Sequence, residues 1–203
     1  MDLFINCLDQ SLSSELKWMN DPKEWSFDDN QALTVSAPAM ADFFRDPAGV
    51  SIKASAPFLY TTINGDFSVE TRVSVDMLKQ YDSGCLMIMA DELNWAKLCF
   101  EFFDNKPSIL SVVTQNNSDD CVSGEAATLH PYLRIARSGK CFAFHYSIDG
   151  EQWKMVRYFG MDAPQELKVG VVAQSPIGEG CKVKFENLLV TPGLIGDVRD
   201  VTK

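Results

Sequence analysis

The amino-acid sequence predicts an all-β protein, folded as a two-sheet antiparallel sandwich. Apolar and polar residues alternate with a period of two in many runs from residue 66 onward, and helical periodicity is almost absent. Turn residues separate these runs at spacings of about 8–12 residues, which favours a sandwich over an α/β fold. The chain has 203 residues, 46% of them apolar, and no shift of composition marks a linker. We therefore expect a single domain over residues 1–203.

The individual strands are predicted from these runs. Residues 68–75 alternate between valine or threonine and charged or hydroxyl side chains, the pattern of a strand with one face in water. Residues 84–90 are apolar at both parities, which indicates a central strand covered on both sides. Further strands are expected over residues 93–103, 109–114, 132–136, 141–147, 153–159, 168–173 and 182–190. Turn sequences separate them at residues 64–66, 104–107, 138–139, 149–150 and 175–178.

The two ends of the chain depart from the strand pattern. Leu12 and Leu16 are spaced i, i+4, so a short helix is expected over residues 9–19. Residues 192–203 lose the alternation and are expected to form a loosely packed tail.

Charge and cysteine content exclude several classes of function. There are 28 acidic and 18 basic side chains, a net charge of −10, which argues against binding to nucleic acid. No apolar run is long enough for a membrane helix, and the first residues lack the pattern of a secretory signal, so no membrane association is expected. Six cysteines without a Cys-x-x-Cys pair, and only two histidines, predict free thiols in the cytoplasm and neither a metal site nor a cofactor.

The strand at residues 93–103 carries the strongest functional signal. One face is purely apolar, whereas the other combines Trp95, Lys97 and Glu101. An aromatic ring beside charged hydrogen-bonding groups suits a sugar, which has apolar ring faces and hydroxyl edges. The structural alternative is that Lys97 and Glu101 simply pair within the sheet.

Catalytic patterns are weak. Glycoside hydrolysis needs two carboxyl groups that flank one bond, and the candidates are Glu101 with Asp82 or Asp119. No Glu-x-Asp-x-x-Glu strand and no Gly-x-Ser-x-Gly elbow occurs in the sequence. The segment 147–153, Ser-Ile-Asp-Gly-Glu-Gln-Trp, is interpreted as a structural hairpin in which side-chain oxygens bind turn amides and the indole ring plugs the turn.

An ordered set of short motifs resembles the regulation-of-enolase-like family, domain of unknown function 1349, over about residues 18–190. Asp42-Phe43-Phe44 is similar to an early Asp-Phe-Trp element of that family, with phenylalanine in place of tryptophan. The other motifs are Tyr81-Asp82-Ser83-Gly84, Trp95-Ala96-Lys97 with Glu101, Ser111-Val112-Val113-Thr114 with Ser118-Asp119, Tyr132-Leu133-Arg134, Tyr146-Ser147-Ile148-Asp149-Gly150 with Trp153 and Arg157, Val169-Gly170, Ser175-Pro176 and Phe185-Glu186.

The resemblance implies a concanavalin A-like jelly roll, similar to legume lectins and to the accessory domains of some xylosidases. It implies no established reaction. Its ligand-binding set, with Trp95 as the stacking ring, is Asp82, Trp95, Lys97, Glu101, Thr114, Arg134 and Arg157. The expected function is therefore non-catalytic binding of a carbohydrate or small molecule, in which Lys97 and Arg134 donate to hydroxyls or to an anionic group. The alternatives are a protein-binding regulatory adaptor and, less favoured, a glycoside hydrolase.

Overall fold

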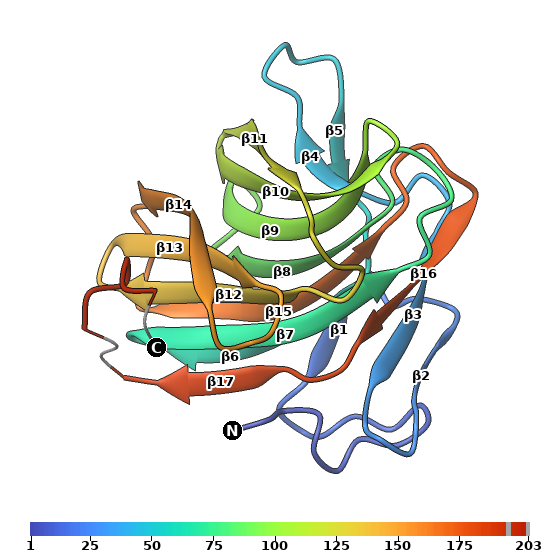
Figure 1. Cartoon of the computed structure of the whole chain (residues 1–203), viewed down its shortest axis with the longest axis horizontal. Helices are drawn as coiled ribbons and strands as arrows, with labels where there is room; N and C mark the ends of the chain where they lie inside the picture. The colour runs from blue at the N-terminus through green and yellow to red at the C-terminus, as the bar shows by residue number, and fades with distance from the viewer. Residues whose placement is uncertain (194–195, 202–203) are drawn as a thin grey trace.

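Two large antiparallel sheets form the molecule (Figure 1). The computed structural model describes residues 1–193 and 196–201. The seven-stranded sheet has the order β1 (Lys17–Met19), β6 (Phe58–Asn64), β15 (Glu166–Gln174), β8 (Ser83–Met89), β9 (Asn94–Phe103), β10 (Lys106–Gln115) and β11 (Asn117–Glu125). The eight-stranded sheet has the order β14 (Trp153–Gly160), β13 (Cys141–Ser147), β12 (Tyr132–Ser138), β7 (Phe67–Val75), β16 (Gly180–Phe185), β3 (Leu33–Pro38) and β2 (Trp25–Phe27), with β17 (Leu189–Pro192) beside β7. The all-β, two-sheet prediction is confirmed.

A third, small sheet pairs β4 (Phe43–Arg45) with β5 (Ile52–Ala54). This hairpin projects at the top of the view, beyond β10 and β11 (Figure 1). The alternation in the sequence did not reveal it, because each strand has only three residues.

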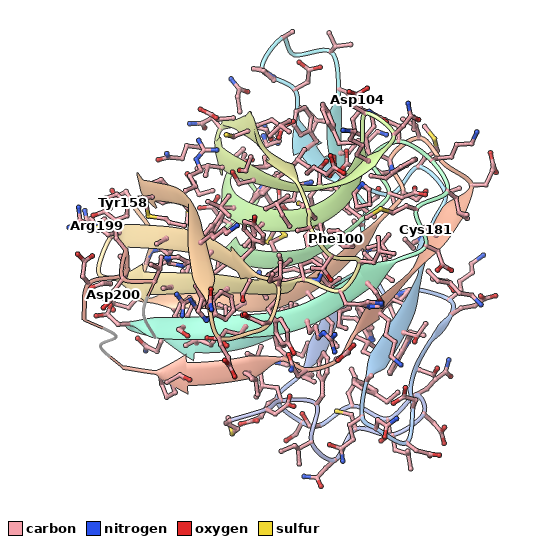
Figure 2. The ribbon with its side chains drawn as sticks, viewed as in Figure 1. Phe100, Asp104, Tyr158, Cys181, Arg199 and Asp200 are labelled. Atoms are coloured by element: carbon pink, nitrogen blue, oxygen red, sulfur yellow. The ribbon has the colours of Figure 1, made fainter. Side chains whose placement is uncertain are left out.

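The main core lies between the two sheets, and a second apolar cluster lies on the outer face of the seven-stranded sheet. Along β9, Leu98 and Phe100 enter the main core, whereas Trp95 and Cys99 point to the outer cluster. Phe100 is near the centre of the molecule (Figure 2). The two faces predicted for residues 93–103 are therefore correct.

Strand β8 is buried along its whole length, as its two apolar parities predict. Its inner side chains join the main core, and its outer ones, including Met87, are covered by Ala41 and Phe43 from the β4 segment. A sheet covered on both faces at this point allows a buried site to form on its outer side.

Most predicted strands form, with one notable difference. The run at 182–190 divides into β16 and β17 because Asn187 interrupts the strand. Its main-chain oxygen accepts from the Thr71 hydroxyl, and its side-chain oxygen accepts from the Arg72 amide.

The 147–153 segment forms the expected structural hairpin. The Ser147 hydroxyl oxygen accepts from the amides of Asp149 and Gly150, and Asp149 Oδ1 accepts from the two following amides. Trp153 is buried beneath the turn, where its ring stacks 4.3 Å from the guanidinium carbon of Arg134.

The helix expected over residues 9–19 does not form. The segment contains turns, isolated bridges and β1. Leu12 packs against the core and Leu16 lies in it, so their spacing reflects burial rather than a helical face. Three serines in this short stretch disfavour a helix because their hydroxyls compete for backbone groups.

The tail also differs from expectation in its described part. Val198 is only 5% exposed and packs with Ala136 and Ala143 on the outer face of the eight-stranded sheet. Arg199 lies over the ring of Tyr158, at 5.3 Å, and Figure 2 shows the two residues side by side. Residues 194–195 and 202–203 lie outside the described residues.

No helix among residues 1–193 and 196–201 is long and apolar enough to cross a membrane.

Candidate functional site

A pocket of about 290 Å³ lies between the β4–β5 hairpin and the outer face of the seven-stranded sheet. Its polar lining comes from five side chains, namely Asp42, Lys97, Glu101, Asp120 and Gln174. Its apolar lining comes from Phe44, Tyr81, Phe103, Val112 and Pro176. The pocket therefore combines three carboxyl groups and one ammonium group with three aromatic rings.

The hairpin is held over the sheet by packing and by hydrogen bonds. Phe43 is buried edge-on against Phe58 and Trp95, at centroid distances of 6.4 and 6.0 Å. The Arg45 amide donates to the Ser118 hydroxyl at 2.9 Å, and Lys53 Nζ donates to the Pro176 carbonyl at 2.8 Å. These contacts make the hairpin a fixed wall of the pocket.

Lys97 is the buried cation of the site, with only 3% of its surface exposed. Its Nζ donates to the Phe43 carbonyl at 2.8 Å, to Gln174 Oε1 at 3.0 Å and to Asp42 Oδ1 at 3.4 Å. Burial opposes its charge, but attraction from Asp42 and other nearby acidic groups outweighs burial and raises the pKa of Lys97. All three ammonium protons are thus used within the protein.

Glu101 is also buried but, unlike Lys97, lacks hydrogen-bond partners in the part of the chain that the structure describes. Its side chain is 8% exposed, and none of the residues in the described ranges gives it a hydrogen bond or ion pair. Burial, together with repulsion from Asp120 and Asp42, raises its pKa well above the ordinary value despite attraction from Lys97. The Glu101 carboxyl group thus has a raised pKa, and its oxygens have no hydrogen-bond partner among the described residues.

Two further groups complete the polar surface. Partial burial raises the pKa of Asp120, which lies on β11 beside the pocket. Gln174 donates from Nε2 to the Ser83 hydroxyl at 3.3 Å while its Oε1 accepts from Lys97. The amide is thus fixed between two strands.

Tyr81 stands at the mouth with a strained backbone. Its φ is 73°, in the left-handed region that bulky side chains rarely adopt. The ring is 38% exposed and lies 6.2 Å from the ring of Phe103. Strain of this kind concentrates at functional sites, which gives these two rings a possible recognition role.

The structure brings together only two of the seven residues predicted for the site, Lys97 and Glu101. Trp95 is on the same face but 1% exposed, so it cannot stack on a ligand. Thr114 is buried and shares a hydrogen bond of 2.8 Å with Ser118.

The other three predicted residues have structural partners elsewhere. Asp82 accepts from the amides of Leu78 and Lys79 and from the Ser175 hydroxyl, so it holds two loops together. Arg157 pairs with Asp119 at 2.9 Å and links β14 to β11.

Arg134 lies on β12, in the other sheet, stacked on Trp153. The alternation along the strand correctly placed Arg134 on a polar face, but it could not show to which sheet that face belongs. Lys97 and Arg134, which were expected to donate together to hydroxyls or to an anionic group, are therefore not brought together, because they belong to different sheets.

Sequence reasoning missed most of the pocket wall. Asp42 and Phe44 were identified only as part of a family motif, and Tyr81 only as a neighbour of Asp82. Asp120 lies in β11, whose burial pattern is almost entirely exposed and therefore gives no strand signal. Gln174 ends β15 directly before the Ser175-Pro176 turn, and this position was the only available clue.

The Lys97→Met substitution tests whether the buried cation holds the hairpin in place. We expect a loss of about 3–5 kcal/mol in the free energy of unfolding, because Asp42 and Gln174 would lose their partner. Urea denaturation at pH 7 measures it. The matched control is Lys184→Met, which removes an exposed pair with Asp28 and should cost less than about 1 kcal/mol. Equal stability of K97M and wild type would show that the cation is not structural.

The raised pKa of Glu101 predicts a pH-dependent stability. Both states hold the proton below the unfolded value, near 4.5, and above it the unfolded chain loses the proton first. Wild-type stability therefore falls as the pH rises from there through the folded-state pKa. We expect Glu101→Gln to match wild type near pH 4 and to be more stable at pH 8, as measured by urea denaturation. Glu166 is exposed, so Glu166→Gln should have the same stability as wild type at every pH. If the stability of Glu101→Gln also matched that of wild type at every pH, the raised pKa of Glu101 would be contradicted.

Comparison with known proteins places this geometry in a family. A model described as "Protein of unknown function (DUF1349)" matches residues 18–193, in agreement with the resemblance seen in the motifs. "Regulation of enolase protein 1" of Saccharomyces cerevisiae is 25% identical over 197 residues, which are 95% of this chain and 99% of that protein. A crystal structure of a functionally unknown protein from Saccharomyces cerevisiae has a TM-score of 0.83 at 25% identity, covering 89% of this chain and 98% of that one.

More distant structures share only the fold. The GH43 BlXynB protein from Bacillus licheniformis has a TM-score of 0.73 at 13% identity, covering 93% of this chain but 38% of that one. The alginate lyase from Klebsiella pneumoniae has a TM-score of 0.60 at 13% identity, covering 83% and 84% of the two chains. Because the family model spans most of the sequence, the chain belongs to the family of proteins of unknown function DUF1349.

Proposed function

We propose that the pocket under the β4–β5 hairpin binds a neutral carbohydrate or a similar polyhydroxylated small molecule. The observation that carries this proposal is the buried, unpartnered Glu101 carboxyl group, which lies in one pocket with the rings of Phe44, Tyr81 and Phe103. A protonated carboxyl group both donates to and accepts from hydroxyls, and aromatic rings cover the apolar faces of a sugar. The volume of about 290 Å³ is at the small end of the range for ligand pockets and suits a ligand of one or two sugar rings.

The charge distribution favours a neutral ligand over an anionic one. The single ammonium group lining the pocket, Lys97, is already paired with Asp42, whereas Glu101 and Asp120 face the cavity. A phosphate or carboxylate group would meet carboxyl groups without a free cation to offset them. Of the two kinds of acceptor expected from the sequence, hydroxyls and an anionic group, this argument favours hydroxyls.

The distant structures support a sugar ligand by fold alone. The GH43 protein BlXynB and a structure described as a xylan beta-1,4-xylosidase from Bacillus halodurans each contain a region of this architecture. A hydrolase would need a second carboxyl group opposite Glu101. Asp82 and Asp119, the partners considered from the sequence, are engaged with main-chain amides and with Arg157, respectively. Two other carboxyl groups line the pocket with Glu101, namely Asp42, which is paired with Lys97, and Asp120. The proposal is therefore limited to binding, and the two carboxylate pairs considered from the sequence are not favoured as a catalytic pair.

A ligand panel tests this proposal. Thermal denaturation is followed with xylose, xylobiose, glucose and glucose 6-phosphate, since a ligand that binds the folded state raises Tm by mass action. We expect a neutral sugar to raise Tm and glucose 6-phosphate to have less effect. Tyr81→Ala should weaken the binding of that sugar at least tenfold in calorimetry, about 1.4 kcal/mol.

Tyr158→Ala is the matched control, because Tyr158 is 46% exposed on the other sheet. It should leave affinity unchanged. If none of the sugars raises Tm, or if Y81A and wild type bind the sugar with equal affinity, this pocket is ruled out as a sugar site.

A second candidate, a regulatory adaptor, is supported by the name of the yeast relative, which refers to enolase. That name also supports the cytoplasmic location expected from the sequence. Sedimentation of the purified chain with purified yeast enolase separates the two candidates. A complex that persists in Y81A would favour the adaptor, whereas a failure to associate would leave the sugar site as the function.

A further inference from the structure

Two cysteines meet on the outer face of the seven-stranded sheet, next to Lys97. Cys85 on β8 and Cys99 on β9 are direct cross-strand partners, and their sulfurs lie 2.8 Å apart. Neither has any exposed surface. Nothing in the sequence spacing suggested this pair, because they are separated by the whole turn between the two strands.

The pattern of main-chain hydrogen bonds between β8 and β9 places these cysteines at a position where a disulfide fits. Asn94 O accepts from the Ala90 amide at one end, and the Phe102 amide donates to Asp82 O at the other. Hydrogen-bonded and non-hydrogen-bonded pairs alternate along an antiparallel ladder, so the Cys85–Cys99 pair is non-hydrogen-bonded. Such pairs have Cα atoms about 4.5 Å apart. This spacing lies within the disulfide range of about 4.4–6.8 Å.

The surroundings make the two thiols chemically unequal. Burial raises the pKa of Cys85, but its hydrogen bond with Cys99 and the positive charge of Lys97 outweigh burial and lower the pKa. Burial and the same hydrogen bond raise the pKa of Cys99 well above its ordinary value. The two thiols are therefore held in different electrostatic environments, with the pKa of Cys85 lowered and that of Cys99 raised.

We propose that Cys85 and Cys99 are a modification site, a dithiol that a small hydroperoxide oxidises to a disulfide. The Cys85 thiol gives up its proton as its sulfur attacks one peroxide oxygen. The O–O bond breaks, the leaving hydroxide takes that proton and departs as water, and Cys85 becomes a sulfenic acid. The Cys99 sulfur then attacks Cys85, the S–O bond breaks, and hydroxide leaves with the Cys99 proton as a second water. Two thiols lose two electrons, and one hydrogen peroxide becomes two waters. An external thiol reverses the change by thiol–disulfide exchange.

Burial restricts which oxidant can react. The cysteines belong to the apolar cluster that includes Phe43 and Trp95, beneath the hairpin. Because neither cysteine has exposed surface, we take a small uncharged peroxide as the oxidant rather than a bulky aromatic disulfide. This site is independent of the proposed sugar binding, since it requires no ligand in the pocket.

Thiol counting by mass spectrometry tests the proposal. The reduced full-length chain is treated with hydrogen peroxide, denatured and labelled with N-ethylmaleimide. We expect the number of labels to fall from six to four, with a peptide map that joins Cys85 to Cys99 and a return to six after dithiothreitol. In the native state, 5,5′-dithiobis(2-nitrobenzoate) should react at the exposed Cys121 and not at this pair.

Variants distinguish this pair from other pairings. Cys85→Ser should retain five labels after peroxide, and Cys99→Ser should fall from five to four because the sulfenic acid at Cys85 has no partner thiol. Cys181→Ser, which removes a buried cysteine of the main core, should fall from five to three. If C85S does not fold, the label count of C99S and the wild-type peptide map still test whether Cys85 pairs with Cys99. A map that joins other cysteines, or one in which residues 85 and 99 stay reduced under peroxide, would overturn the proposal.

Discussion

The buried ammonium group of Lys97 is the interaction on which the rest of the site depends. An ammonium group held away from water must find acceptors for its protons within the protein. It finds three acceptors in two separate segments, namely Asp42 and the Phe43 carbonyl in one and Gln174 in the other. Two of these acceptors belong to the segment leading into the β4–β5 hairpin, so the cation fixes that hairpin over the sheet. The hairpin in turn forms one wall of the pocket and covers the apolar cluster that contains Cys85 and Cys99.

This use of the only lysine in the pocket determines what the cavity offers to a ligand. Because the Lys97 ammonium group is bound by acceptors within the protein, the other ionisable groups in the pocket lining are carboxyl groups, and the pKa of Glu101 among them is raised. The site therefore presents hydrogen-bonding capacity with little positive charge. The aromatic rings at the rim add apolar surface, and the unusual backbone of Tyr81 indicates that one of these rings is held there at a conformational cost.

Local patterns in the sequence predicted the strands well, but not the sheet to which each strand belongs or the residues that cover it. The run at 141–147 coincides with β13, and the two faces of β9 are as the alternation indicates. Alternation reports only which side chains share a face, so it placed Arg134 on a polar face without revealing that this face belongs to the other sheet. It also identified Trp95 as a stacking ring, because nothing in β9 itself reveals that Phe43 covers it.

The elements that were missed have a common physical cause. Strand β11 is exposed on both faces, and β4 and β5 are three residues long, so neither shows a period of two. Asp120 and Phe44, which these elements supply to the pocket, could not be placed from the sequence. The Cys85–Cys99 contact likewise depends on the register across a turn, and that register is determined by the packing of both strands.

The same polar character of β11 has a consequence for the behaviour of the protein in solution. An edge strand with unpaired amides and carbonyls invites another chain to add to the sheet and so begins aggregation. Here the edge carries Asp119 and Asp120, and Arg157 from β14 bridges to it, so a charged strip protects the end of both sheets. Together with a net charge of −10, this arrangement disfavours edge-to-edge growth of fibrils from the folded molecule.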